Sequence, residues 1–186
     1  MLLTGPTSVA RVSVVARRSV EVVVVADLGR AQVYAAELAA FDGTDLEAVI
    51  DVDRVLSAMR RVTAGEWWPG GDVTVKPARS DARSSSTRCG AEEGSVAAIT
   101  IAAPQATIAT AAHELAHALA GVAHGHDATY RRAHLDVVQA ITNVDRVTSR
   151  GMVHVAQLWN AYAAAGLDVG DREWPEPPAA GGAIAL

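Results

Sequence analysis

Four histidines and two carboxylates lie within the fifteen-residue stretch HELAHALAGVAHGHD, in a chain that has only six histidines. On an α-helix, residues four apart share one face, with Cβ atoms ~5–6 Å apart. His113 and His117 can therefore direct imidazole nitrogens at one ion, at the ~2.0–2.1 Å that zinc requires. Glu114 lies about 100° further round the helix, where it could take a proton from a metal-activated water without binding the ion. The spacing predicts a metal centre with Glu114 as its general base.

A third ligand is needed for such a centre, and both His124 and His126 are close enough, because an extended chain spans ~3.3–3.6 Å per residue. His126 directly precedes Asp127, a good N-cap for the next helix. A ligand held at a helix start costs less ordering entropy than one in a loop. His124 stands between Ala and Gly and has the freer backbone. We favour His126, and His124 remains the alternative. Asp127 could instead orient a ligand histidine through a hydrogen bond.

Regular elements must position these side chains. A helix is expected over about 106–120, ending at Gly121. Its apolar stripe lies roughly opposite the histidines and consists of Ile108, Leu115, Leu119 and Val122. The β-branched segment 95–102 before it predicts a strand, either an edge strand that could bind an extended peptide or an internal one.

The helix that follows Asp127 begins with ATYRRAHLDVV. On it, Tyr130 is expected to pack behind the motif helix, although its hydroxyl could also bind a substrate oxyanion. We interpret His134 as an ordinary helix-surface residue, with a position facing the site as the alternative.

The remaining chain predicts an α+β domain. We expect strands at residues 20–26 and before Pro77, a loop or irregular hairpin at 81–94, and helices over 30–41, 45–62 and 151–165. Residues 1–18 are expected to form a flexible tail and 169–186, rich in Pro and Gly, a disordered one. Residues 19–168 then form a single domain.

The composition of the chain indicates which partners, cellular compartment and metal to expect. A net charge of −5 and a pI near 5.6 argue against a nucleic-acid partner, since such binding relies on phosphate neutralisation. The single cysteine, Cys89, suits a reducing cytoplasm, and no apolar run is long enough to span a membrane. His and carboxylate ligands fit Zn²⁺ best among the common ions.

The segment HELAHALAGVAHGHDATYRRAHLDVV resembles the small zincin-type metallopeptidases, including the SprT-like and minimal gluzincin families. Residues from about 30 to 169 are similar to a family of small metallohydrolases from actinobacteria and their phages. That family has a "VYAAE"-like helix and a motif of the form HELAH…HGPxF. In it, an aromatic follows the third histidine by four positions, as Tyr130 follows His126. This chain differs in having Asp127 where Gly is common, and Tyr for Phe.

The resemblance implies a zincin-like fold, in which a small twisted β-sheet is flanked by helices and the motif helix packs on it. It also implies a zinc-dependent peptidase acting on a protein or peptide substrate. Two alternatives remain, namely a metal-dependent hydrolase of non-peptide amides or esters, and a non-catalytic, metal-stabilised protein-interaction module.

Overall fold

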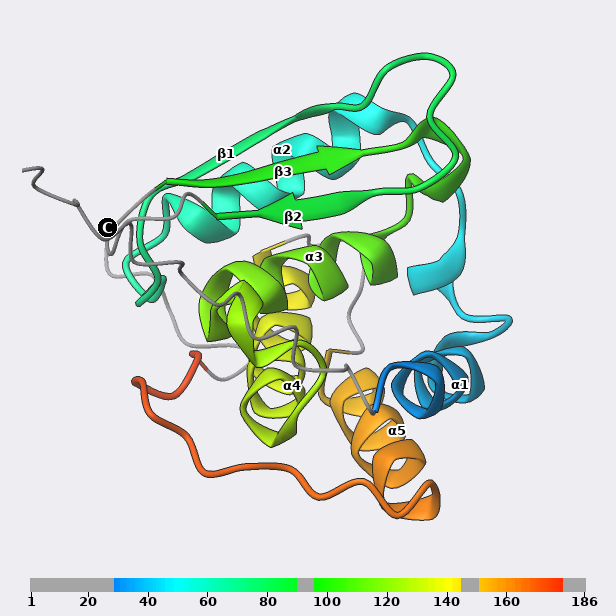
Figure 1. Cartoon of the computed structure of the whole chain (residues 1–186), viewed down its shortest axis with the longest axis vertical. Coiled ribbons are helices and arrows are strands. Elements are labelled where there is room, and N and C mark those ends of the chain that lie inside the picture. Colours follow the sequence, from blue (N-terminus) through cyan, green and yellow to red (C-terminus); the bar gives the residue numbers. More distant parts are fainter. Residues whose placement is uncertain (1–28, 90–95, 145–150, 179–186) are drawn as a thin grey trace, which may run out of the picture.

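The computed structural model describes residues 29–89, 96–144 and 151–178, and within these ranges the chain is an α+β protein (Figure 1). Its strands form one small mixed sheet. The elements are α1 (Arg30–Phe41), α2 (Val52–Thr63), β1 (Val73–Pro77), β2 (Ser86–Arg88), β3 (Ala97–Ile101), α3 (Ile108–Ala120), α4 (Ala128–Val144) and α5 (Gly151–Ala164). Short 3-10 turns lie at Asp45–Glu47, Ala103–Gln105 and Val122–His124. The strand expected at 20–26 and the tail 1–18 lie outside the described residues.

The sheet has the order β1-β3-β2, with β1 parallel and β2 antiparallel to β3. Along β3 the buried positions alternate, as expected for a strand with one face on the core: Ala97, Ile99 and Ile101. Because β3 has a partner on each side, the edge-strand interpretation of residues 95–102 is wrong. The edge next to the motif helix is β2, in a segment that the sequence predicted as a loop or irregular hairpin. Its three polar residues, Ser-Thr-Arg, give no apolar alternation to detect.

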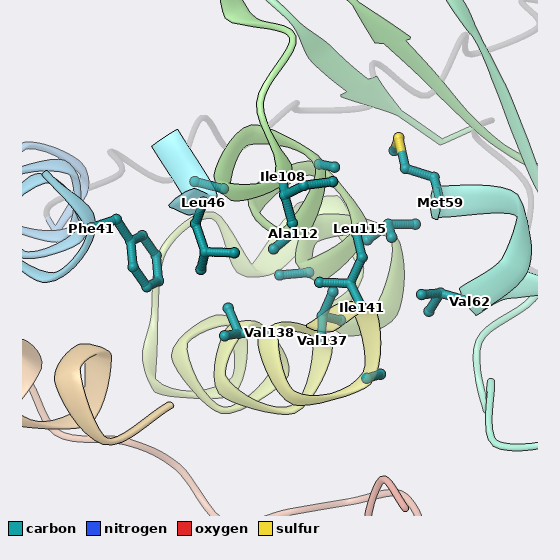
Figure 2. Close-up of a cluster of buried hydrophobic side chains, with 14 of the residues drawn as sticks. Phe41, Leu46, Met59, Val62, Ile108, Ala112, Leu115, Val137, Val138 and Ile141 are labelled. Atoms are coloured by element: carbon teal, nitrogen blue, oxygen red, sulfur yellow. The ribbon is translucent and has the colours of Figure 1, made fainter. Parts of the chain in front are cut away.

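The core lies between the motif helix α3 and α4. In Figure 1 the sheet covers α3 from above, α4 lies below it, and α1 and α5 pack side by side at one end. Figure 2 shows the α3 side chains facing those of α4, with Phe41 and Leu46 at one end of the cluster and Met59 and Val62 at the other. The predicted stripe is buried at Ile108 and Leu115 but reaches the surface at Val122.

One long helix over 45–62 was predicted, and the structure divides it. A 3-10 turn occupies Asp45–Glu47, and α2 starts only at Val52. Asp51 caps α2, because its carboxylate accepts the amides of Asp53 (2.9 Å) and Arg54 (3.3 Å). The amide of the preceding Ile50 donates to the Ala106 carbonyl instead of continuing a helix. This hydrogen bond joins the segment just before α2 to the residues just before α3.

The segment after α5 differs from the predicted disordered tail as far as residue 178. Residues 167–178, called the strap below, run in extended form across the protein (orange to red in Figure 1). The Arg172 guanidinium forms two hydrogen bonds to the buried Asp136 carboxylate, at 2.7 and 2.9 Å, and the Trp174 indole donates a third at 2.9 Å. Trp67 donates to the Pro175 carbonyl. The composition of this segment predicted disorder, because composition does not reveal that Arg172 and Trp174 bind a buried carboxylate on α4, that of Asp136.

In the parts of the chain that the structure describes, none of the helices combines the length and the apolarity needed to cross a bilayer.

Candidate metal centre

Three histidines converge between α3 and the start of α4. Each of His113, His117 and His126 offers one ligand nitrogen, and these atoms all lie within 4.8 Å of one another. The Nε2 atoms of His113 and His126 are 3.4 Å apart. Two ligands at ~2.0–2.1 Å in a tetrahedral zinc site stand about 3.3–3.4 Å apart. The spacing of His113 and His126 therefore matches such a site, and all three nitrogens lie close enough together to hold a metal ion.

The connector between the two helices explains how the third histidine reaches the other two. Helix α3 ends at Gly121 (φ 90°), and Gly125 (φ 52°) lies just ahead of His126. Both backbones are in the left-handed region that favours glycine. With these two turns the chain reverses within five residues, so that His126 faces the side of α3 that carries His113 and His117.

The alternative ligand, His124, points elsewhere. Its Nδ1 lies 2.9 Å from the Asp127 carboxylate, and its side chain is 42% exposed. The other oxygen of Asp127 accepts the Tyr130 amide at 3.0 Å, which is the predicted N-cap contact. Asp127 therefore caps α4 and holds His124, and neither residue is part of the three-histidine group. The sequence also suggested that Asp127 could orient a ligand histidine. The histidine that it contacts is His124, which does not belong to the three-histidine group.

Glu37, on α1, contacts the far side of the centre. Its two carboxylate oxygens lie 3.0 and 3.1 Å from Nδ1 of His113. A proton held on Nδ1 leaves the lone pair of Nε2 directed toward the other two histidines, as a metal ligand requires. Burial by itself would raise the pKa of Glu37, but the neighbouring His113 and His134 outweigh it and hold that pKa well below its usual range.

Two further buried side chains, those of Tyr130 and His134, contact Glu37. The Tyr130 hydroxyl lies 2.7 Å from Nδ1 of His113 and 3.2 Å from Glu37 Oε1, and burial raises the pKa of Tyr130 well above its usual value. Since Tyr130 is fully buried, it packs behind the motif helix, as expected. His134 is also buried, with Nδ1 3.3 Å from Glu37 and 2.8 Å from the Tyr162 hydroxyl. Its interpretation as a helix-surface residue is therefore wrong.

Glu114 is held by the edge strand of the sheet. The Thr87 hydroxyl of β2 lies 2.6 Å from Glu114 Oε2 and 2.9 Å from the Glu114 carbonyl oxygen. Burial raises the pKa of Glu114, while the Thr87 hydrogen bond and the nearby His113 partly oppose that rise. A carboxylate whose pKa is raised accepts a proton more readily near neutral pH, which suits a general base.

The protonation of the centre favours metal binding at His117. Burial first, and then the positive charges of His113 and His126, lower the pKa of His117 to about 3. His117 is therefore neutral at physiological pH, and the neutral imidazole is the form that binds a metal. His113 differs, since its pKa is raised: burial lowers it, but the Glu37 carboxylate more than compensates. Metal binding at His113 therefore competes with protonation up to a higher pH than it would at an unperturbed histidine.

A cavity of about 390 Å³ opens beside the centre. Helix α1 forms one wall with Arg30 and Tyr34, and α3 forms the other with His113 and Glu114. The other polar residues of the lining are Glu37, Glu47, Ser84, Ser85, Gln105 and Thr110. The cavity therefore gives solvent-sized molecules access to the carboxylate of Glu114 and the ring of His113.

The structure brings together the three histidines that the spacing selected, and it adds groups that sequence reasoning missed. Glu37 lies 76 residues before His113 and Thr87 lies 27 residues before Glu114. Glu37 stands within the VYAAE segment on which the family resemblance rests, and this was the one signal that could have drawn attention to it. No comparable signal marks Thr87.

Comparison of the whole chain with known proteins finds no matching family model, no matching curated protein and no matching solved structure. The resemblance to zincin-type families therefore remains a prediction, and the function has to be inferred from the site itself.

Proposed function

We propose that this protein is a zinc-dependent metallohydrolase that cleaves peptide bonds. The observation that carries the proposal is the convergence of His113, His117 and His126 on one point. His113 and the neighbouring Glu114 also line a cavity. When bound, a zinc ion would supply a Lewis acid for the scissile carbonyl and lower the pKa of a coordinated water to ~7. Within the described residues the histidine group has three members and His124 is engaged by Asp127. A fourth position left open for water is what a catalytic zinc site requires.

Glu114 is the group that moves protons. It takes a proton from the attacking water at its carboxylate and then donates it to the amine that leaves when the peptide bond breaks. The Thr87 hydroxyl fixes one carboxylate oxygen, Oε2, at 2.6 Å, so that the carboxylate cannot rotate freely while it exchanges the proton. Glu37 holds His113 from behind and takes no part in proton transfer.

The position of β2 favours a peptide over other amides and esters. This strand is at the edge of the sheet, and its Thr87 contacts the proposed base directly. An extended substrate could add to such an edge through backbone hydrogen bonds, which would place its peptide bonds next to Glu114. The sequence offered this role to the segment 95–102 as one of two alternatives. Because β3 is internal to the sheet, we propose β2 for it instead.

Two measurements test the proposal. Metal content by mass spectrometry should be close to one zinc per chain in the wild type and in His124→Ala, and should be lost in His126→Ala. A His126→Ala protein that keeps its zinc, or a His124→Ala protein that loses it, would contradict the ligand set. This comparison is matched, because both variants lose one imidazole from the same connector.

Catalysis is tested separately with Glu114→Gln. This variant should keep its zinc and lose about 10²–10⁴-fold in the turnover of a peptide library, the usual contribution of a general base. Thr87→Val should retain part of that activity, because it removes only the contact that orients Glu114. If Glu114→Gln cleaves peptides as fast as wild type, the proposed role of Glu114 is wrong. If the wild type binds zinc but cleaves small amides or esters and no peptide, the substrate class is wrong.

A further inference from the structure

Arg131, one turn into α4, connects the backbone of His126 to the C-terminal strap. Its Nη1 donates to the His126 carbonyl at 2.6 Å and its Nε donates to the Asp168 carbonyl, also at 2.6 Å. The side chain is almost completely buried, with the residue 8% exposed. Hydrogen bonds from a charged, buried donor contribute about 1.5–3 kcal/mol each, so both carbonyls are held firmly.

The strap is in turn docked against the first turn of α4. The Gly170 amide donates to the Ala128 carbonyl at 2.9 Å, and Arg132 Nε donates to the Gly170 carbonyl at 2.9 Å. The two backbones are very close here, since a Cβ added at Gly170 would lie 3.0 Å from the carbonyl carbon and oxygen of Ala128. A side chain at position 170 would therefore press on the Ala128 backbone, and the strap or α4 would have to shift by a few tenths of an ångström.

The third histidine depends on this contact more than the other two do. His113 and His117 stand inside α3, where the helical hydrogen bonds fix their backbone. His126 follows the connector, whose Gly121 and Gly125 give it unusual freedom. Its carbonyl is fixed by Arg131, which the strap orients from the other side.

We propose that the strap positions His126 for metal binding through Arg131, so that the affinity of the centre depends on a segment outside it. The inference rests on the proposed metal centre and deepens it. Arg131 is a positioning residue, because it touches the backbone of a ligand and not the ion. Losing a group that orients a metal ligand typically weakens metal affinity 10–100-fold.

The test compares Gly170→Ala with Gly71→Ala as a matched control. An added Cβ meets nothing within 4 Å at Gly71, so both variants gain one methyl group but only one of them displaces the strap. Zinc affinity is measured by competition with a chromophoric chelator, and folding by circular dichroism. We expect a Kd about 10-fold higher for Gly170→Ala and unchanged for Gly71→Ala. Arg132→Gln removes one strap hydrogen bond without adding atoms, and should give a smaller loss in the same direction.

A double-mutant cycle separates positioning from general destabilisation. His126→Ala leaves His113 and His117 as weak ligands, so its zinc affinity is measured with zinc in large excess. In this background the affinity should no longer respond to Gly170→Ala, since the strap acts through His126. A Gly170→Ala protein that melts earlier but binds zinc as tightly as wild type would overturn the inference and leave the metal centre intact. A response of equal size with and without His126 would also overturn it. A wild type that binds no zinc would refute the centre itself.

Discussion

Replacing Glu37 by glutamine removes the carboxylate behind His113 while preserving its shape. In the wild type this side chain is only 13% exposed and interacts with His113, Tyr130 and His134. A glutamine amide presents an oxygen on one side and an N–H donor on the other. It cannot accept from all three groups, and it carries no charge to stabilise a proton on Nδ1 of His113.

The expected effect on zinc affinity follows from the role of that proton. Without a carboxylate to hold it on Nδ1, His113 can carry its proton on Nε2, the atom that has to bind the ion. Loss of an orienting carboxylate behind a ligand histidine costs 10–100-fold in metal affinity, or about 1.4–2.7 kcal/mol. The metal-free protein should also lose stability, by about 3–5 kcal/mol if the buried pair with His113 is fully broken.

Glu47→Gln provides the control, because Glu47 lines the same cavity and the change removes the same charge. The pKa of Glu47 is raised by burial and then by the negative charges of Glu37 and Asp42. Neutralising Glu47 should therefore relieve repulsion and leave zinc affinity within a factor of about two. Chelator competition gives both affinities, and urea unfolding of the metal-free proteins gives both stabilities. Equal affinities for Glu37→Gln and wild type would show that the Glu37 carboxylate does not prepare His113 for the metal. Equal losses in the two variants would show that the effect is not specific to Glu37.

Three further predictions concern stability. Leu115→Ala, at a fully buried position facing α4, should lower the free energy of unfolding by about 2–5 kcal/mol in urea, and the half-buried Leu119→Ala by clearly less; equal losses would contradict the packing described. The pKa of His117 is about 3 in the folded protein and 6.5 for an unperturbed histidine, the value taken for the unfolded chain. Between these two pH values the unfolded state therefore binds more protons than the folded state. The stability of the metal-free protein should therefore fall as the pH drops from 6.5 toward 3, with His117 contributing at most about 1.4 kcal/mol per pH unit, and His117→Ala should flatten that slope. Asp51→Ala should cost about 1 kcal/mol by removing the cap of α2, as measured by thermal unfolding; no change in melting temperature would argue against the cap.

Local patterns predicted the elements that are regular along the chain. The helix over the HELAH motif, the turn at Gly121 and the cap at Asp127 each depend on residues within one turn of each other, and the structure has all three. The segment 45–62 was the exception among the helices. Its apolar spacing continues across Asp51, and the pattern does not register that this carboxylate starts a new helix.

Features that depend on distant contacts were not predictable in this way. The side chain that orients His113 comes from α1, and the side chain that contacts Glu114 comes from a three-residue strand with no apolar alternation. His134 has the sequence context of a surface residue, and only the packing of α1 and α5 buries it. The strap has a composition typical of disorder, and it is held by contacts with residues distant in sequence, such as the buried Asp136.

The closeness of the three histidines along the chain has a consequence for folding kinetics. His113 and His126 are separated by 13 residues, whereas 76 separate Glu37 from His113. Closing the longer loop costs about 1.6 kcal/mol more in chain entropy, from the ratio of the two lengths. The hairpin formed by α3 and the start of α4 can therefore fold before α1 packs against it. We expect zinc, if present during synthesis, to be captured by this hairpin and to act as a nucleus on which α1 later docks its carboxylate.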